Sequence, residues 1–297
     1  MDRKIAIPTG VARTIHVMET RSKSQASLLG LPRELRLEIY RHVFALDLQC
    51  TILNGWRDTH TQEHGFRSVP EVDGDADLIV PWLSIMLTCK DLACEMQSVM
   101  KEKSFSENPQ TTTWSLDLEG KRGGMALGHT TWQRIPCPPD QVRILQASYN
   151  TKRGFQSWGD GGPHGITSGL YQTLNFILHC GPRFDAEYRL PAKMHLEELR
   201  ISLESREDVT RQYDDDHYMS LSDRETNPET MLYALGSIVG QIVNTGVLRG
   251  YVDMITVCSV DNDKTLSWTP REVKGDGIPE YWHRYGFEWG ERAFSSE

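Results

Sequence analysis

The sequence has few features that would direct the protein to a membrane, a secretory route or a nucleic acid. Its first twenty residues contain no apolar stretch of the length a secretory signal requires, and no Asn-x-Ser/Thr acceptor occurs. The six cysteines form no C-x-x-C pair, so we expect reduced thiols that are mostly buried. Positive charge is in deficit, because the net charge is −9, and this disfavours nucleic-acid binding. These absences predict a cytoplasmic or nuclear protein with neither nucleic acid nor membrane as partner.

Common catalytic signatures are also missing. The chain has no G-x-G-x-x-G, no G-x-x-x-x-G-K-[S/T] and no G-x-S-x-G. The glycine-rich residues 158–166 precede a predicted helix, and we interpret them as a turn rather than an anion cradle. His60, Glu63 and His64 match the H-x-x-E-H zinc pattern, but they lie in a polar stretch without helical periodicity. We therefore expect no enzyme, no cofactor and no metal, and keep a zinc hydrolase as a remote alternative.

One long uncharged run could be mistaken for a membrane span. Residues 231–248 carry no charge and include Gly236 and Gly240, the small-residue spacing of membrane helix pairs. Their apolar side chains, however, repeat at intervals of three and four and leave a polar opposite side. This pattern predicts a half-buried helix whose glycines let it lie close to a sheet.

The composition is that of a folded chain, with 38% apolar and 25% charged residues, and its 297 residues predict about two domains. Residues 1–26 are polar and lack periodicity. A helix is predicted over residues 32–45, and a second over 82–103 with Leu83 and Leu87 among its apolar contacts. Between them, residues 46–81 are expected to form an inserted loop, apart from a short strand at 49–53.

After residue 104 the period changes to that of strands alternating with helices. Strands are predicted at 111–118, 142–149, 196–203 and 251–260, and helices at 166–180 and from Met231 onward. Residues 197–229 carry eleven acidic and four basic side chains, so 205–229 is expected to be an acidic loop. The predicted fold class is α+β: a helical module at 27–104, then an α/β region at 111–297 with a mixed sheet. The sheet region has the order strand-helix-strand-helix-strand.

Two further expectations concern the C-terminal half. The aromatic residues of 280–291 are expected to pack onto the body of the protein. His179, on the predicted helix 166–180, is expected to be an interior or boundary histidine with its hydrogen bonds satisfied rather than a metal ligand.

The segment LLGLPRELRLEIYRHVFA, residues 28–45, carries the one motif with functional content. It resembles the opening of the F-box, and more closely the F-box-like module with an E-x-R signature that occurs in filamentous-fungal protein families. The matching residues are Leu31-Pro32, Glu34-Leu35-Arg36 and Ile39-Tyr40. The segment LTCKDLACE, residues 87–95, is similar to a second part of that pattern. Residues 170–182 and 196–203 look like the later helix and strand of such proteins.

The resemblance implies a protein that docks on another protein and does no catalysis. An F-box binds the Skp1 adaptor of a cullin ubiquitin ligase, and the remainder of such a chain captures a target protein. Docking of this kind needs apolar side chains on one side of a helix. The residues implied as partner-binding are Leu31, Pro32, Leu35, Ile39 and Val43. Glu34 and Arg36 are expected to form local salt bridges that orient the helix.

A second interpretation of the same helix stays open. In an ordinary F-box the helices follow one another within about forty residues, whereas here residues 46–81 separate the first two helices. The helix could therefore bury its apolar side in its own protein, which would make this a structural or interaction protein without a ligase role. Exposure of Leu35, Ile39 and Val43 distinguishes the two interpretations.

Overall fold

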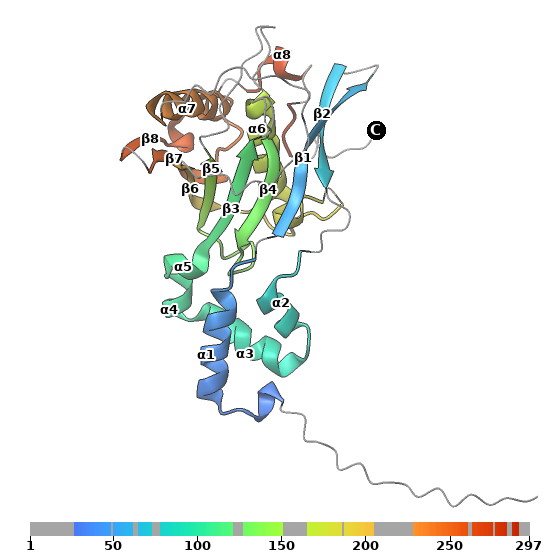
Figure 1. Cartoon of the computed structure of the whole chain (residues 1–297), viewed down its shortest axis with the longest axis vertical. Helices are drawn as coiled ribbons and strands as arrows, with labels where there is room; N and C mark the ends of the chain where they lie inside the picture. Colours follow the sequence, from blue (N-terminus) through green and yellow to red (C-terminus); the bar gives the residue numbers. More distant parts are fainter. Residues whose placement is uncertain are drawn as a thin grey trace, which may run out of the picture.

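The computed structural model describes residues 27–48, 50–61, 65–72, 78–120, 127–150, 165–185, 187–204, 228–260, 263–275, 277–283 and 287–290. These residues form a mixed α/β structure built on one eight-stranded sheet of order β2-β1-β4-β3-β5-β6-β7-β8. A group of short helices lies at one end of the sheet (Figure 1). The predicted fold class, N-terminal helices followed by an α/β region, is confirmed. The predicted segments 1–26 and 205–227 lie outside the described residues.

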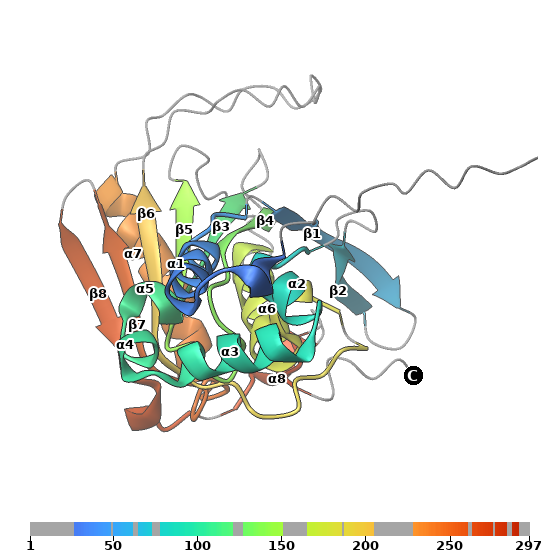
Figure 2. The same cartoon turned by 90° about the horizontal axis from the view of Figure 1, so that it is seen from below.

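The centre of the sheet is parallel. It runs β5 (Ile144–Asn150), α6 (Gly165–Cys180), β6 (Leu196–Glu204), α7 (Pro228–Asn244) and β7 (Val252–Ser259). The neighbouring pairs β5·β6 and β6·β7 are parallel, so the predicted strand-helix-strand-helix-strand order is confirmed. Both helices cover the same face of the sheet (Figure 2), as expected when successive crossovers have one hand.

Antiparallel strands extend the sheet on both sides. β3 (Thr113–Gly120) is parallel to β5, and β4 (Leu127–Arg134), β1 (Cys50–Thr61) and β2 (Gly65–Val72) follow outward from it. At the other edge, β8 (Lys264–Trp268) pairs with β7. The prediction of a loop over 46–81 was wrong, because 50–61 and 65–72 form a hairpin that joins the sheet. Its stabilising partner, β4, lies about 80 residues away in the chain, and a local hydrophobic pattern does not record such a pairing.

The N-terminal helices lie beside the ends at which β3 and β5 begin (Figure 1). They are η1 (Leu28–Gly30), α1 (Arg33–Phe44), α2 (Pro81–Met86), α3 (Lys90–Lys101), α4 (Lys103–Ser106) and α5 (Pro109–Thr112). The single helix predicted over 82–103 is broken, because Cys89 adopts an extended conformation with φ −161° and ψ 161°. The Thr88 hydroxyl donates to the carbonyl of Ile85 at 2.7 Å, a local bond of the kind that competes with helix continuation.

The two regions share one hydrophobic core within the described residues. Phe44 of α1 and Phe105 of α4 meet edge to face, with ring centroids 4.7 Å apart. Trp82 of α2 donates from Nε1 to the carbonyl of Ile135 at 2.7 Å. Trp114 and Trp132, both fully buried, form a T-shaped pair on β3 and β4. The helical module is therefore packed onto the sheet by large aromatic side chains.

The glycines of α7 lie against strand β8, as predicted. A Cβ at Gly236 would lie 2.5 Å from Leu266 Cδ1, and one at Gly240 would lie 3.5 Å from Trp268 Nε1. The absence of side chains at these two positions lets helix and strand approach closely. Across the described residues, no helix is both long and apolar enough to cross a membrane.

The C-terminal segment packs on α6, which is itself buried along most of its length. η3 (Gly181–Arg183) follows α6, and η4 (Pro270–Glu272) and α8 (Glu280–His283) precede the last described residues. Trp282 and Phe287 are buried, so the predicted packing of the aromatic tail onto the body is confirmed for these two side chains.

Candidate partner-docking face

The five predicted partner-binding residues lie at the start and along one side of α1. Leu35 is 53% exposed, Pro32 is exposed, and Leu31, Ile39 and Val43 are partly exposed. A spacing of four residues places Leu35, Ile39 and Val43 on one flank of the helix, and Leu31 and Pro32 precede its first turn. We call these five residues the α1 row. Of the five, Val43 also contacts the core. The α1 row is thus an apolar flank that the described residues leave partly uncovered, most clearly at Leu35.

A different side of α1 attaches the helix to the rest of the protein. Arg36, Tyr40 and Phe44 are also spaced by four, and Tyr40 and Phe44 are fully buried. The core contact is therefore made by a row offset by one residue from the α1 row. Sequence periodicity alone did not distinguish the two rows, because both carry bulky side chains.

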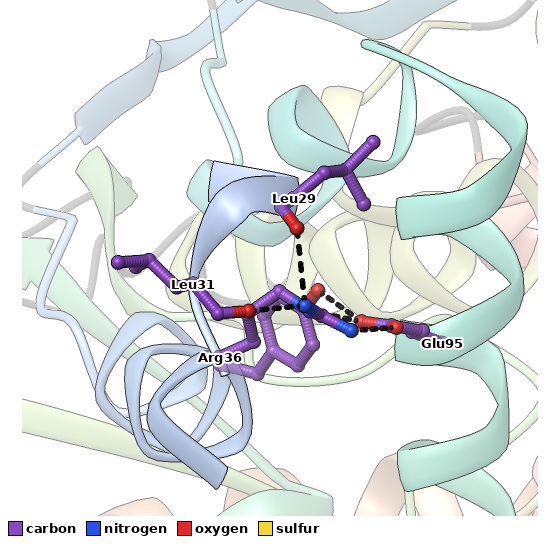
Figure 3. A network of polar contacts seen from close by, with 5 residues as sticks. Leu29, Leu31, Arg36 and Glu95 are labelled. Atoms are coloured by element: carbon purple, nitrogen blue, oxygen red, sulfur yellow. Dashed lines mark hydrogen bonds and ion pairs between the residues drawn. The ribbon is translucent and has the colours of Figure 1, made fainter. Parts of the chain in front are cut away.

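An ion pair joins α1 to α3. Arg36 donates from Nε to Glu95 Oε2 at 2.8 Å and from Nη2 to Glu95 Oε1 at 2.5 Å, and Tyr40 Oη donates to Glu95 Oε2 at 2.8 Å (Figure 3). The same guanidinium donates from Nη1 to the carbonyl of Leu31 at 2.5 Å. The side chains of Arg36 and Glu95 are 13% and 26% exposed. One arginine thus fixes both the helix and the Leu-Pro turn that precedes it.

This network corrects the expected local salt bridges. The partner of Arg36 lies 59 residues away in the chain, not on the same helix. Glu34 is exposed and forms no ion pair within the described residues. Arg36 and Glu95 come from the two segments, 28–45 and 87–95, that carry the resemblance, and the structure brings these segments into contact.

The charge states in the network follow from its contacts. The hydrogen bonds from Arg36 lower the pKa of the Glu95 carboxyl below its ordinary value, and Tyr40 adds to this effect. Burial, followed by the bond to Glu95, raises the pKa of Tyr40 to about 12. At neutral pH the carboxylate is charged and the phenol is protonated, which is the combination that forms all three bonds to Glu95.

A second exposed apolar row lies along α2. Ile79, Leu83 and Leu87 are 66%, 37% and 78% exposed and are again spaced by four. Leu83 and Leu87 had been predicted as core contacts of a longer helix, and this was wrong, because α2 ends at Met86 and buries Trp82 instead. The helical module therefore carries apolar surface on both α1 and α2. Among the described residues, exposed apolar surface of this kind is more frequent here than elsewhere.

The face of the sheet opposite α6 and α7 is polar. Paired residues of neighbouring strands point to the same face, and one continuous row crosses seven strands. The row comprises Thr51, Thr131, Asp117, Ser148, Ser202, Cys258 and Thr265. No helix of the described chain covers this face (Figure 2). Parallel sheets are usually covered on both faces, so a polar face without a covering helix in the described part of the chain is a distinctive feature, although Ser148 and Ser202 at its centre are buried.

The zinc hypothesis loses its structural premise. His60 lies on β1 and is paired with Phe66 of β2, so the segment begins as a strand and not as a helical turn. Glu63 and His64 lie outside the described residues. Within the part of the chain that is described, no three His, Cys, Asp or Glu side chains are grouped so as to hold a metal ion.

Comparison of the chain with protein-family models, curated proteins and solved structures found no match. The resemblance to the F-box-like module therefore depends on the motif residues and on the contacts between them.

Proposed function

We propose that this protein is a non-catalytic substrate receptor of the cytoplasm or nucleus whose α1 docks on a Skp1-like adaptor of a cullin ubiquitin ligase. The α/β region would present a target protein to that ligase. The exposure of Leu35 on an otherwise anchored helix is the observation that carries the proposal.

An exposed apolar flank supports docking because burial against a partner removes its apolar area from water. Such burial contributes about 25 cal/mol per Å². Binding energy at protein interfaces is concentrated in a few anchors surrounded by weaker contacts. Leu35 and Ile39 are the best candidates for such anchors, since neither belongs to the hydrophobic core or to the side chains packed against it.

The Arg36–Glu95 pair supports the same function by holding the row in place before binding. Arg36 bonds the carbonyl of Leu31 on one side and the carboxylate of Glu95 on the other. The side chain of Leu31 points away from this pair (Figure 3), and it is partly exposed. A surface fixed before association loses less conformational entropy on binding.

The polar sheet face supports the second half of the proposal. A receptor needs a target surface distinct from its adaptor surface, and the helices lie beside the starting ends of β3 and β5 rather than over this face. Asp117 is partly exposed and Thr265 is exposed on this face, so their carboxylate and hydroxyl groups are suited to polar protein contacts, whereas Ser148 and Ser202 are buried.

The alternative is a structural or interaction protein in which α1 is core and no ligase is involved. That interpretation expects Leu35, Ile39 and Val43 to be covered by residues 83–100 or by the sheet. Val43 does contact the core, but Leu35 is exposed and Ile39 is partly exposed. Docking through Leu35 and Ile39 therefore requires no unfolding of the helix.

The experiment is a binding titration of the purified chain with a purified Skp1-like adaptor. We expect saturable binding by the wild type and a loss of about 10- to 100-fold for Leu35→Ala/Ile39→Ala, the effect of removing two interface anchors. Tyr233→Ala is the matched control. Tyr233 is 54% exposed on α7, away from the helical module, so its removal should leave the affinity unchanged.

Two outcomes would contradict the proposal. Failure of the wild type to bind the adaptor removes the ligase role. Equal binding by the wild type and Leu35→Ala/Ile39→Ala shows that the adaptor binds elsewhere. Circular dichroism of the double variant separates loss of the interface from loss of the fold.

A further inference from the structure

One side chain of α6 clasps the C-terminal segment 287–290. Asn175 donates from Nδ2 to the carbonyl of Glu288 at 3.1 Å, and the amide N–H of Gly290 donates to Asn175 Oδ1 at 3.0 Å. The segment also inserts Phe287, which is fully buried against Tyr171 and Trp282 with ring centroids 5.0 and 4.5 Å away. We call residues 287–290 the strap.

His179 lies one helical turn after Asn175 and contacts the strap directly. Its ring is 5.4 Å from that of Trp289, in an edge-to-face arrangement, and 5.0 Å from that of Tyr251. Gly290 has a φ of +67°, and a Cβ there would lie 3.4 Å from His179 Nε2. The strap thus ends directly over the imidazole, at a position that favours glycine.

Two hydrogen bonds fix the tautomer of this histidine. His179 Nδ1 lies 2.8 Å from the carbonyl oxygen of Asn175, which can only accept, so Nδ1 carries the proton. His179 Nε2, 2.9 Å from Tyr251 Oη, is then the acceptor of the phenolic proton. Both nitrogens of a neutral ring are satisfied, and the expectation of a satisfied interior or boundary histidine is confirmed.

The surroundings disfavour a second proton on the ring. Burial lowers the pKa of His179, and Arg189 and Lys193 lower it further, against an opposing effect of the Asn175 carbonyl. Lys193 Nζ lies 3.9 Å from the centre of the Tyr251 ring, so a cation already lies against the hydrogen-bond partner of the histidine. The strap contributes Glu288, whose negative charge adds to the effect of burial in raising the pKa of Tyr171.

We propose that His179 is a proton-sensitive latch that holds the strap on α6 while the imidazole is neutral and releases it when the imidazole is protonated. Protonation turns Nε2 into a donor, so Tyr251 must rotate its own proton away in order to accept. It also adds a third positive charge to a partly dehydrated site beside Lys193 and Arg189. Both changes act at the surface on which Trp289 and Gly290 lie.

The strap is suited to release because the two aromatic residues that Phe287 packs against have buried polar atoms without hydrogen bonds. Tyr171 Oη and Trp282 Nε1 are buried, and neither has a hydrogen-bond partner in the described structure. Burying a polar group without a partner costs free energy that hydration restores on exposure. The aromatic contacts offset this cost, and the charge on His179 determines whether the strap stays bound.

The sign of the pH dependence follows from linkage. The latched state has the lower pKa, so the released state binds protons more readily. The strap is therefore fully held at pH values above the ordinary histidine pKa of about 6.5, and its attachment weakens as the pH falls below that value. At pH values below both pKa values, the equilibrium for holding the strap weakens about tenfold for each unit by which the pKa of His179 is lower in the latched state than in the released state.

The test is amide hydrogen exchange of Gly290 in the full chain, measured by NMR from pH 7.5 to 5.0 and corrected for the intrinsic rate. We expect protection at pH 7.5, a loss of about tenfold or more at pH 5.0, and a midpoint that matches the titration of the His179 imidazole. His179→Gln, which cannot titrate, should remove the pH dependence. His195→Gln is the matched control, because His195 pairs with Asp253 on the surface and should leave it unchanged.

Lys193→Gln tests the latch without altering the histidine. Removal of this cation should raise the pKa of His179 and move the release midpoint to higher pH. Protection of Gly290 that stays constant across the range, or that falls equally in the wild type and His179→Gln, overturns the proposal. A His179→Gln variant that fails to fold leaves Lys193→Gln as the deciding measurement, and an unmoved midpoint there is also contrary to the latch.

Discussion

Arg36 and Glu95 form a two-pronged ion pair across 59 residues of sequence, and Tyr40 donates a third hydrogen bond to the same carboxylate. The arginine comes from the E-x-R segment and the glutamate from the second segment of the resemblance, so the pair joins the two parts of the motif. A bidentate arginine also fixes the orientation of the two helices, because its planar guanidinium donates two parallel hydrogen bonds to a carboxylate in one geometry. The motif residues thus act as a structural clip, while the apolar residues beside them remain available to a partner.

The clip predicts a rank order of destabilisation. Tyr40→Phe removes one bond to a charged acceptor without opening a cavity, and we expect it to lower the free energy of unfolding by about 1–2 kcal/mol. Arg36→Gln should lower it further, because Glu95 then loses its counter-charge and the carbonyl of Leu31 loses its donor. Urea unfolding of both single variants and of the double variant measures the coupling. Strict additivity of the two changes would contradict a shared network.

Truncation to alanine should destabilise the protein strongly at Phe44 and hardly at all at Leu35. Phe44 is buried against Phe105, so Phe44→Ala should cost about 3–5 kcal/mol of stability. Leu35 is exposed, so Leu35→Ala should change stability by no more than about 0.5 kcal/mol. Thermal unfolding of the two variants is sufficient to compare them. A large loss for Leu35→Ala would favour the interpretation of α1 as self-buried core.

The close approach of α7 to β8 predicts a contrast between two glycines. Gly236→Val places new carbon atoms where Leu266 already lies, and overpacking of this kind costs about 1–3 kcal/mol. Gly240→Ala meets Trp268 at ordinary contact distance and gains helix propensity, so it should be neutral or slightly stabilising. Chemical denaturation of both variants checks the contrast, and equal effects would mean that the helix does not rest on β8 through Gly236.

The cysteines should differ sharply in reactivity. Burial raises the pKa of the Cys137 thiol to about 12 and that of Cys180 to about 11, whereas Cys94 is exposed on α3. At pH 8 a thiol with a pKa of 12 is about one part in ten thousand thiolate. We expect iodoacetamide to modify Cys94 in the native protein and to spare Cys137 and Cys180 until denaturant is added. Mass spectrometry of the native and unfolded protein reads this directly, and native labelling of Cys137 at the rate of Cys94 would be inconsistent with its burial.

Local patterns predicted the central elements of the fold well. The helix over 32–45 and the parallel strands and helices after residue 140 depend on apolar periodicity, which neighbouring residues carry themselves. The glycines of α7 could be interpreted as a close contact with a sheet because the polar opposite side of the helix disfavoured a membrane helix pair. The outer strands β1, β2 and β4 were missed or shortened, since their stability comes from pairing with distant segments.

The candidate site was predicted only in part. The spacing of Leu35 and Ile39 placed them on one flank of α1, but it could not say whether that flank was covered. The partner of Arg36 was out of reach, because nothing in a linear pattern relates residue 36 to residue 95. The exposure of Leu83 and Leu87 was not predicted, because the pattern was interpreted as one continuous helix and the chain is broken at Cys89.

The chain passes between the helical module and the sheet at three points, from α1 to β1, from β2 to α2 and from α5 to β3, and the first and last of these are widely separated in the chain. α1 leads into β1, where the amide of Leu48 donates to the carbonyl of Gln133 at 2.7 Å, and α5 leads directly into β3. Between these connections, Trp82 adds a side-chain bond to the carbonyl of Ile135. A body fastened at two separate points cannot swing about either of them. Anything bound to α1 would therefore be held in a constant orientation relative to the sheet, without a flexible linker between them.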